Sequence, residues 1–455
     1  NIPADALRRY QCVAARCTLS ARDDDGDGDP AIAAGRHVPH PAGGGDGDLV
    51  QTVLAAATPP GEPHVQRLIS DAQHTQTLPG KRRRGEGEGP VHDVAVNEAY
   101  DGLGATWTLY WQAFGRNSLD GSGLTLPATV HYGAGYDNAF WDGQRMVFGD
   151  GDGRIFNRFT VSVDVIGHEL THGVTQVTAG LLYNGQSGAL NESLSDVFGS
   201  LVKQHALGQS ANDADWLIGQ GLFTSRVKGR ALRDMLNPGT AYDDPTLGKD
   251  PQPATMAGYV KTTADNGGVH VNSGIPNRAF ALAARAIGGF AWEGAGAIWY
   301  AVLTGGAIPA RCDFATFAAL TITEASRAHG VDSPQHEAVA QAWTTVGVTP
   351  SGALPGTPAE ADPGTLAVTR SGGFTGLMKS RTATLDALPH KDAEAWRTLL
   401  EGDQLAQFTE IPGHPDAFQY TVCANGEVLC ASDNALPSRI VHLIERFLDE
   451  APGAP

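Results

Sequence analysis

The sequence is short of positive charge, of cysteine and of long apolar runs. Its 455 residues include 32 Lys and Arg against 50 Asp and Glu, which gives a net charge of −18. Because nucleic-acid backbones are bound by clustered positive charge, nucleic acid is not expected as a partner. No run approaches the ~18 consecutive apolar residues of a transmembrane helix, so no membrane partner is expected either.

The five cysteines are too few for a disulfide framework in a chain of this length. Cys423 and Cys430 flank Asn425-Gly426, a dipeptide that favours a two-residue hairpin turn. In that register Cys423 faces Val428, so the two cysteines are diagonal neighbours and poorly placed for a bridge. The redox compartment therefore stays open.

The N-terminus shows no apolar segment of the kind found in signal peptides. Cytoplasmic synthesis is expected, and export by a route without a signal peptide is left open. Because the first residue is Asn, a removed segment is left open as well.

The pattern along the chain predicts an α+β protein built from several units. Over residues 64–160 strand-like stretches, among them 130–132 and 145–148, mix with a helix expected over 93–114. Helices dominate from 160 to 346, and four are expected there, over 162–182, 189–207, 275–288 and 314–330. The segment 349–364 is rich in proline and glycine, which is typical of a linker, and strand, hairpin and helix patterns follow it. The expected units are 1–60, 61–180, 181–348, a linker at 349–364, and a small α+β domain at 365–450.

Two charged segments allow more than one interpretation. The acidic, Gly-rich stretch 22–48 contains Asp23–Gly28, which matches the first half of a calcium loop. The twelfth loop position is Ala34 and not Glu, so a solvated linker is the preferred interpretation. Residues 78–89 carry four basic residues, Lys81 to Arg84, and are expected to form an exposed loop, with a cleavage site or an anion patch as alternatives.

The strongest chemical signal is the HExxH sequence from His168 to His172. Spacing of i, i+4 places both imidazoles on one face of a helix, where they can bind one zinc ion. Glu169 projects beside them and can take a proton from a zinc-bound water. Glu192, in a second helical stretch, supplies a third ligand and leaves one position open, as a catalytic zinc requires. Asp196 follows one turn later and can orient a ligand imidazole.

Residues 64–347, which include these motifs, resemble the thermolysin-like zinc metallopeptidases of the protealysin type. The resemblance implies a two-lobed fold, with a β-rich N-terminal lobe that includes the HExxH helix and a helical C-terminal lobe. It rests on long motifs in the expected order: NAFW (138–141), GDGDG (149–153), GHELTHGVT (167–175), AGLLYN (179–184), SGALNESLSDVFG (187–199), ALRDM (231–235) and DNGGVHVNSGIPNRAF (265–280).

The resemblance also implies a role for each matching residue. His168, His172 and Glu192 correspond to the zinc ligands, and Glu169 to the general base. Tyr183 and His270 correspond to the pair that hydrogen-bonds the oxyanion, with Asp265 holding His270. Asp196 and Asn191 match the partners of the two ligand histidines. Asn138, Ala139 and Arg233 match the groups that hold the substrate backbone. The resemblance further implies an apolar S1′ pocket, lined by Phe156, Val165, Ile218 and Leu232. Cleavage before bulky hydrophobic residues is therefore expected.

The calcium sites of the family are not all matched. Asp164 and Asp215 stand at matching positions, but Lys203 replaces a bridging Glu, and its ammonium can pair with both carboxylates instead. Further acidic ligands are replaced by Leu217, Gln220 and Arg230. One catalytic zinc is therefore expected, and calcium binding is in doubt.

Both ends of the chain carry shorter resemblances. Ile2, Pro3 and Leu7 keep part of a propeptide motif of protealysin-type precursors, and Cys12 or Cys17 is weighed as a blocking zinc ligand against two cysteines with no role. The C-terminal part resembles emfourin inhibitors of such peptidases. It does so through LAVTRSGGFTGL (366–377), LPHKDAEAWRTLL (388–400), DAFQYTV (416–422) and LPSRIVHLIERF (436–447).

Together these patterns predict a zinc-dependent neutral endopeptidase, made as a precursor and regulated by its propeptide and by a fused inhibitor-like domain. Its expected partners are protein or peptide substrates and these two segments of its own chain, and a monomer is expected. The alternative is an inactive protease-fold scaffold or binding protein, with residues 365–450 as an accessory partner-binding module. The complete set of ligands and base favours the enzyme.

Overall fold

The computed structural model describes residues 63–350, 366–373, 379–401, 418–424, 427–432 and 436–449. The predictions for residues 1–60, including the acidic segment and the roles of Cys12 and Cys17, lie outside these residues. So does nearly all of the linker 349–364.

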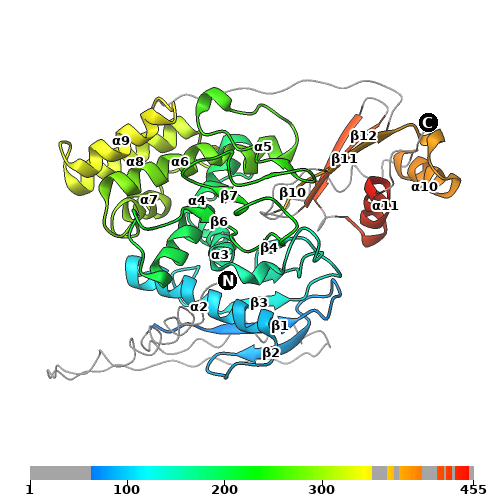
Figure 1. The fold of residues 1–455 in the computed structure, drawn as a ribbon, viewed down its shortest axis with the longest axis horizontal. Helices are drawn as coiled ribbons and strands as arrows, with labels where there is room; N and C mark the ends of the chain where they lie inside the picture. The colour runs from blue at the N-terminus through cyan, green and yellow to red at the C-terminus, as the bar shows by residue number, and fades with distance from the viewer. Residues whose placement is uncertain are drawn as a thin grey trace, which may run out of the picture.

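A five-stranded sheet forms the N-terminal lobe, in the order β2-β1-β3-β5-β4 (Figure 1). The three central strands run parallel to one another, and each edge strand is antiparallel to its neighbour. The strands are β1 (Arg67–Asp71), β2 (Lys81–Gly85), β3 (Leu126–Val130), β4 (Ala139–Trp141) and β5 (Met146–Phe148). The strand predicted around Val130–Tyr132 therefore begins and ends earlier, and the one at Arg145–Phe148 is confirmed to within a residue.

Helix α2 (Val94–Phe114) packs against this sheet through a long buried face. The Asp93 carboxylate accepts hydrogen bonds from the backbone N–H groups of Ala95 and Val96, which caps the first turn. Gly115 ends the helix in the left-handed conformation, with a φ of 65°. The helix predicted over 93–114 is confirmed.

The loop predicted at 78–89 was wrong, because its basic residues form strand β2. Arg84 is 6% exposed, and its guanidinium lies 3.5 Å from the centre of the Tyr100 ring and donates to Asn97. The backbone of β2 pairs with β1. Both the strand partner and the aromatic ring are remote in sequence, so a run of four cations looks locally like a solvated loop.

The second lobe is mainly helical and packs on α2 and α3 around one continuous apolar core. The HExxH sequence lies on α3 (Val163–Val177). The other helices are α4 (Gly185–Leu207), α5 (Asp265–Asn272), α6 (Gly274–Ile287), α7 (Ala295–Thr304), α8 (Phe314–His329) and α9 (Pro334–Thr345). Short elements complete it: η1 (Phe159–Val161), β6 (Leu217–Ile218), β7 (Arg233–Asp234), β8 (Asp243–Asp244), β9 (Gly248–Lys249) and η2 (Met256–Gly258).

Four of these helices, α3, α4, α6 and α8, were predicted from the sequence. The helix α3 was expected to continue to Leu182 but ends at Val177, and Gly180 then adopts a φ of 55°. The two-lobed arrangement of a β-rich and a helical part is confirmed.

The C-terminal part forms a small α+β domain with its own core, which includes the fully buried Trp396 and Ile444. An antiparallel sheet in the order β11-β10-β12-β13 packs against two helices. Cys423 lies opposite Val428, as the hairpin register predicted. The elements are β10 (Leu366–Gly372), β11 (Lys379–Ala383), η3 (Leu385–Ala387), α10 (His390–Glu401), β12 (Phe418–Ala424), β13 (Glu427–Ser432) and α11 (Ser438–Asp449).

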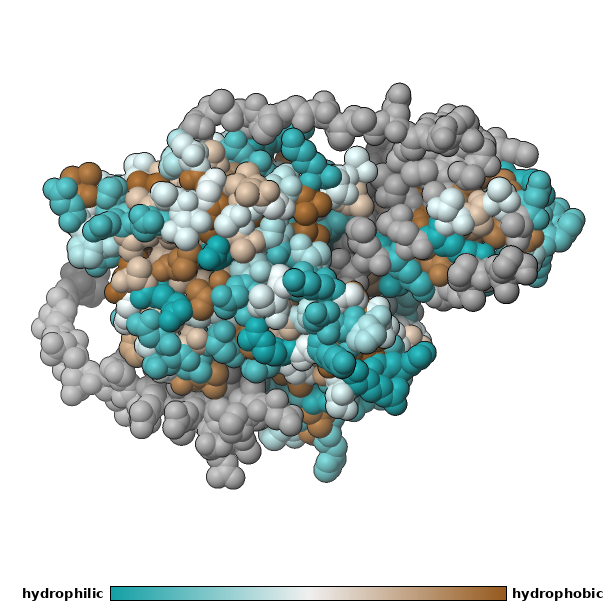
Figure 2. Space-filling model, turned by 45° about the horizontal axis from the view of Figure 1, so that its top comes forward, coloured by the Kyte–Doolittle hydropathy of each residue, from teal (hydrophilic) through white to brown (hydrophobic). Residues whose placement is uncertain are grey.

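This domain lies beside the two lobes, and β10 reaches from it to the side of α5 (Figure 1). On the face drawn in Figure 2, hydrophilic and hydrophobic residues are interspersed. Among the described residues, no helix is both long and apolar enough to cross a bilayer.

Candidate active site

Two helices that touch through glycine carry the central residues of the site. His168, Glu169 and His172 lie on α3, and Glu192 lies on α4. A Cβ placed on Gly199 of α4 would lie 2.4 Å from the backbone oxygen of Asp164 on α3. The absent side chain therefore lets the two helices approach closely enough to share one site.

Three potential ligand atoms converge between these helices. The Nε2 atoms of His168 and His172 lie 3.1 Å apart. The Glu192 carboxylate oxygens lie 3.5 Å from the first of them and 3.6 Å from the second. Two ligand atoms about 2.0–2.1 Å from a tetrahedral zinc ion are about 3.3 Å apart, so this geometry fits zinc. All three side chains are at most 1% exposed.

The outer nitrogen of each histidine is held by a polar neighbour. His168 Nδ1 lies 2.8 Å from Asp196, and His172 Nδ1 lies 2.9 Å from Asn191 Oδ1. Ser195 Oγ is also 3.1 Å from His172 Nδ1, a contact that the sequence reasoning missed. These contacts direct both Nε2 atoms toward each other, because the two nitrogens of one ring point in opposite directions.

Asp196 is the centre of a buried polar network. Arg233 donates to both of its oxygens at 2.7 Å, and Asn277 donates to Oδ2 at 2.7 Å. Burial alone would raise the pKa of Asp196, but Arg233 and His168 hold that pKa well below its usual range. The carboxylate is thus kept ionised beside His168. Asn277, on α6, was also missed, since nothing in its local sequence points to α4.

Glu169 and a second group of polar residues complete the site. Glu169 is fully buried on α3. Tyr183 donates to Glu192, and its hydroxyl lies 3.2 Å from His270 Nε2. His270 Nδ1 lies 2.6 Å from Asp265, which precedes a left-handed turn through Asn266, Gly267 and Gly268.

Comparisons with known proteins agree with this geometry. A family model described as the thermolysin metallopeptidase catalytic domain matches residues 72–176, and one for its alpha-helical domain matches 179–348. The chain is 55% identical to an extracellular metalloprotease of Pectobacterium carotovorum subsp. carotovorum, over 66% of this chain and 88% of that relative. The chain belongs to the thermolysin-like zinc metallopeptidases. It is 51% identical to Protease PrtS of Photorhabdus sp. (strain Az29), over 62% of this chain and 76% of the relative.

A solved structure and a third family model refine this assignment to the protealysin type with an emfourin domain. The precursor of protealysin, a metalloproteinase from Serratia proteamaculans, aligns with a TM-score of 0.63 and 59% identity, covering 66% of this chain and 92% of that one. The emfourin model matches residues 368–448. The protein is therefore a zinc neutral metalloendopeptidase that carries an emfourin domain.

The structure also places the residues expected to bind substrate in this peptidase. Asn138 immediately precedes edge strand β4, Ala139 begins it, and both are fully buried. Arg233 lies on β7 and contacts Asp196. The four residues expected in the S1′ pocket are each at most 3% exposed and belong to the main core; they are Phe156, Val165, Ile218 and Leu232.

Lys203 lies between Asp164 and Asp215, the two carboxylates that the resemblance matched to calcium ligands. Its Nζ lies 3.0 Å from Asp164 and 2.9 Å from Asp215, and it also donates to the Leu217 carbonyl. Burial lowers the pKa of Lys203, but the two carboxylates outweigh burial and raise it. The ion pair expected from the sequence is confirmed. Arg230 pairs with Asp234 at 2.7 Å.

Proposed function

We propose that this zinc peptidase cleaves proteins and peptides on the N-terminal side of bulky hydrophobic residues. The observation that carries the proposal is the zinc-binding geometry of α3 and α4 beside buried apolar side chains. Val165 lies one helical turn before Glu169 on α3 and is fully buried, so apolar surface adjoins the reacting groups. A hydrophobic side chain that follows the scissile bond gains free energy by leaving water for such surface.

The residues of the chain divide the reaction among themselves. Zinc held by His168, His172 and Glu192 would lower the pKa of a water molecule toward ~7 and polarise the scissile carbonyl. Glu169 accepts the proton of the attacking water and delivers it to the leaving amine.

Charge that develops on the carbonyl oxygen is met by two fixed donors. The Tyr183 hydroxyl and His270 Nε2 lie 3.2 Å apart and would donate to the oxyanion, with Tyr183 turning its hydrogen bond from Glu192 to the substrate, and Asp265 keeps the His270 ring in place. Asn138, Ala139 and Arg233 hold the substrate backbone. Because this polar framework exists before substrate arrives, little reorganisation is needed during the reaction.

A peptide series with one varied residue after the scissile bond tests the specificity. Peptides with Leu or Phe at that position should have a kcat/KM roughly 10- to 200-fold above those with Gly or Asp. Equal cleavage before Gly, Asp and Leu would contradict the proposal, and removal of zinc by a chelator should stop all cleavage.

We also propose that residues 1–60 are a removable propeptide. Ile2, Pro3 and Leu7 carry the motif match, and the similar solved structure is that of a precursor. Incubated wild type should release an N-terminal fragment cut between about residues 22 and 63, whereas Glu169→Gln should stay intact if processing is autocatalytic. A stable, uncut and fully active wild type would count against a propeptide.

Calcium binding at the Lys203 position is proposed to be lost. An ammonium group between Asp164 and Asp215 neutralises the charge that would attract calcium. The melting temperature should then be nearly indifferent to added calcium. A rise of ten degrees or more, well above the ~2–4 °C that 1 kcal/mol produces in a domain of roughly 150–250 residues, would contradict the proposal.

A second part of the proposal is that the emfourin domain inhibits the peptidase of its own chain. Phe418 of this domain packs edge-on against Tyr136, with the ring centres 5.9 Å apart, and Tyr136 lies two residues before Asn138, which is expected to hold substrate. A Cβ on Gly373 would lie 3.2 Å from Asn138 Oδ1. The end of β10 therefore lies next to a residue expected to hold substrate.

Charge and tethering favour the same arrangement. Arg370 of the emfourin domain interacts electrostatically with Asp137, the neighbour of Asn138. The linker 349–364 joins the domains, and tethering of this kind gives an effective concentration on the order of millimolar. A domain that binds weakly would thus remain docked. A monomer is sufficient for this inhibition, because the inhibitor is part of the same chain.

Cutting the tether tests inhibition within the chain. A cleavage site for an unrelated protease is placed in the linker, and the cut protein is then diluted. Specific activity should rise on dilution, and excess emfourin domain should lower it again. If cutting and dilution change nothing, the domain is an accessory module and not an inhibitor.

A further inference from the structure

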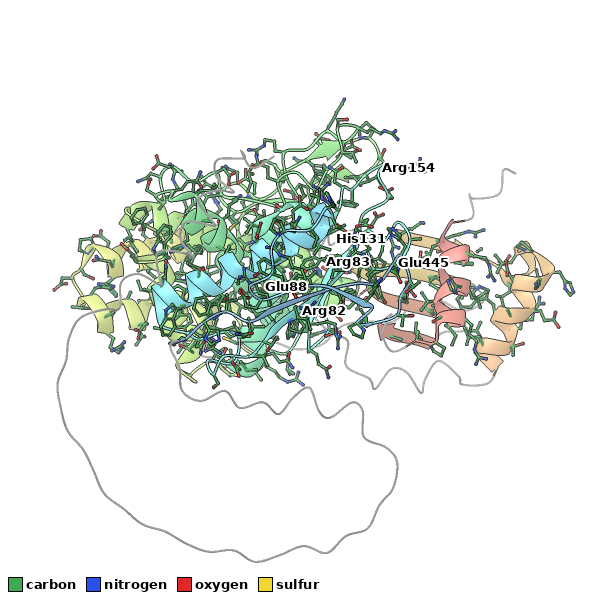
Figure 3. All side chains as sticks on the ribbon, turned by 90° about the horizontal axis from the view of Figure 1, so that it is seen from below. Arg82, Arg83, Glu88, His131, Arg154 and Glu445 are labelled. Atoms are coloured by element: carbon green, nitrogen blue, oxygen red, sulfur yellow. The ribbon has the colours of Figure 1, made fainter. Side chains whose placement is uncertain are left out.

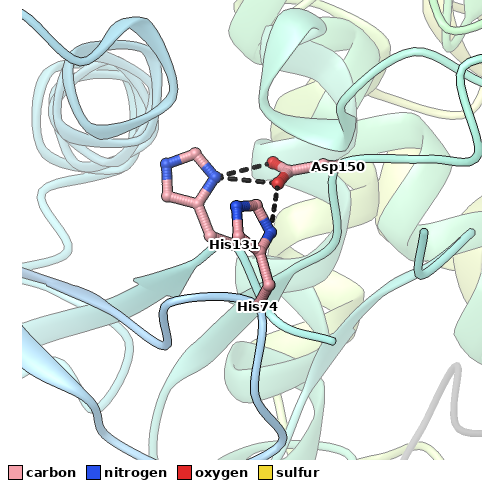
Figure 4. A group of neighbouring side chains, drawn as sticks. All are labelled: His74, His131 and Asp150. Carbon is pink, nitrogen blue, oxygen red and sulfur yellow. Dashed lines mark hydrogen bonds and ion pairs between the residues drawn. The ribbon is translucent and has the colours of Figure 1, made fainter. Parts of the chain in front are cut away.

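A second group of metal-binding side chains lies away from the active site, at one edge of the N-terminal sheet. The parallel strands β1, β3 and β5 are neighbours, so their carboxyl ends meet at the same edge. His74, His131 and Asp150 follow these three strands within a few residues. The topology therefore gathers three residues that are far apart in sequence (Figure 4).

The three side chains point toward one another. His131 Nδ1 lies 2.8 Å and His74 Nδ1 lies 3.3 Å from Asp150 Oδ2. One ligand atom from each residue falls within 4.8 Å of the others. The separation expected for two ligands of a tetrahedral zinc ion is about 3.3 Å. The contact between His74 and Asp150 already has this length, and the contact between His131 and Asp150 needs to lengthen by about half an ångström.

We propose that His74, His131 and Asp150 form a second site for a divalent transition-metal ion of the zinc type. Two imidazoles and one carboxylate are ligands that zinc prefers over calcium or magnesium. The His74 side chain is 61% exposed, so a fourth position is open to water.

A carboxylate behind the group supports this assignment. His131 Nε2 lies 3.0 Å from Asp93, the capping residue of α2. A metal-bound histidine usually donates its other N–H to such a carboxylate, which fixes the ring and makes the ligand nitrogen more basic. Asp93 is thus a positioning residue, which acts on the metal through His131.

The surrounding charge also favours a cation. Two arginines come near: Arg83 lies 4.0 Å from Asp93, beside His131 in Figure 3, and Arg158 interacts with Asp93 and Asp150. Each is already bonded to a carboxylate outside the group, Arg83 to Asp71 at 3.2 Å and Arg158 to Glu98. The charges of Asp93 and Asp150 therefore remain available to a metal ion.

Backbone hydrogen bonds hold the loops that carry the ligands. The N–H of His74 donates to the His131 carbonyl at 2.8 Å, and the N–H of Tyr132 donates to the Phe148 carbonyl at 3.1 Å. Because these hydrogen bonds order the loops before any ion binds, metal binding costs little conformational entropy. Zinc at this site should accordingly stabilise the folded N-terminal lobe.

The experiment counts zinc ions in the full chain carrying Glu169→Gln, which prevents self-cleavage. Equilibrium dialysis against zinc chloride should give one zinc fewer per chain after the additional change His74→Gln. His329→Gln removes an exposed histidine at the end of α8 and should leave the count unchanged. Asp93→Asn, which keeps a capping oxygen, should weaken the second zinc roughly 10- to 100-fold.

Thermal unfolding gives a readout that does not depend on catalysis. We take the Glu169→Gln chain with one zinc ion bound, at the active site. Added zinc should raise its melting temperature, and His74→Gln should abolish that rise. Unchanged zinc counts in His74→Gln and in a second variant, Asp150→Asn, would overturn the proposal and leave the group as an ion-paired contact between loops.

Discussion

The chemistry of the active site depends on charged side chains that are withdrawn from water. Asp196 is fully buried, yet its pKa is held low because Arg233 and His168 contact it directly. Lys203 is almost as buried and stays charged through Asp164 and Asp215. A buried charge of this kind is tolerated only with its partners, so the effect of a substitution depends on what it leaves unpaired.

Replacing Glu169 by Gln should separate metal binding from turnover. The amide keeps the size of the side chain but cannot accept the water proton. Zinc content should stay at the wild-type value, while kcat falls by roughly 10²–10⁴-fold. Glu293→Gln, at an exposed position, is the matched control and should keep full activity. Near-normal turnover in Glu169→Gln would remove Glu169 from the mechanism.

Replacing Lys203 by Met should destabilise the protein by about 3–5 kcal/mol, because Asp164 would keep a buried charge without its ammonium partner. Unfolding in urea measures this loss. Lys261→Met removes an exposed ammonium and should change the free energy of unfolding by less than about 0.5 kcal/mol. Equal effects of the two changes would show that the Lys203 ion pair adds nothing to stability.

At the scale of elements, the site depends on how closely α3 and α4 approach. HExxH fixes the two histidines on one helix, but the third ligand arrives only because α4 packs on α3 at Gly199. The parallel strands β1, β3 and β5 act in the same way for His74, His131 and Asp150. In both places the spacing between elements, and not a single side chain, sets the distance between ligand atoms.

Gly199→Ala should weaken zinc binding and lower stability by about 1–3 kcal/mol, because the new methyl meets the rigid backbone of α3. Gly102→Ala on α2 is the contrast: there the three nearest atoms all belong to the Ile166 side chain, the nearest being its terminal Cδ1, and none belongs to the backbone. Zinc affinity and melting temperature should fall less in Gly102→Ala. If the two variants behave alike, the glycine contact does not set the ligand geometry.

At the scale of the whole molecule, the emfourin domain contacts the peptidase near Asn138. Tyr136 packs against the separate core of the emfourin domain, and β10 runs beside α5, the helix that carries His270. In the proposed inhibition, this contact between the domains limits the access of substrate to the active site. A change on the emfourin side can test that link without touching the peptidase residues.

Gly373→Val should raise the activity of the intact chain by pushing the domain away from Asn138. Gly373 has a φ of 70°, and a Cβ there would lie 2.5 Å from Phe418 as well as near Asn138. Gly306→Val is the matched control, since Gly306 has a φ of 72° and a Cβ added there would meet no atom within 4 Å. Steady-state kinetics on one peptide compares them. A Gly373→Val chain no more active than Gly306→Val would contradict inhibition at this contact.

The sequence by itself determined the parts whose information is local. The i, i+4 spacing of His168 and His172, the helix that begins after Asp93 and the pairing of Cys423 with Val428 each depend on residues close together in the chain. These features were predicted and agree with the structure. The resemblance added the family, because long motifs in a fixed order carry more information than any single spacing.

Only the tertiary structure decided the contacts between distant segments. Strand β2 forms because Arg84 finds Tyr100 and the backbone of β1, and Asn277 joins the site because α6 packs near α4. The positions of Gly373 beside Asn138, and of His74 beside His131, likewise depend on how whole elements meet. Such contacts have no local pattern, since burial and hydrogen bonding select them only after the chain has folded.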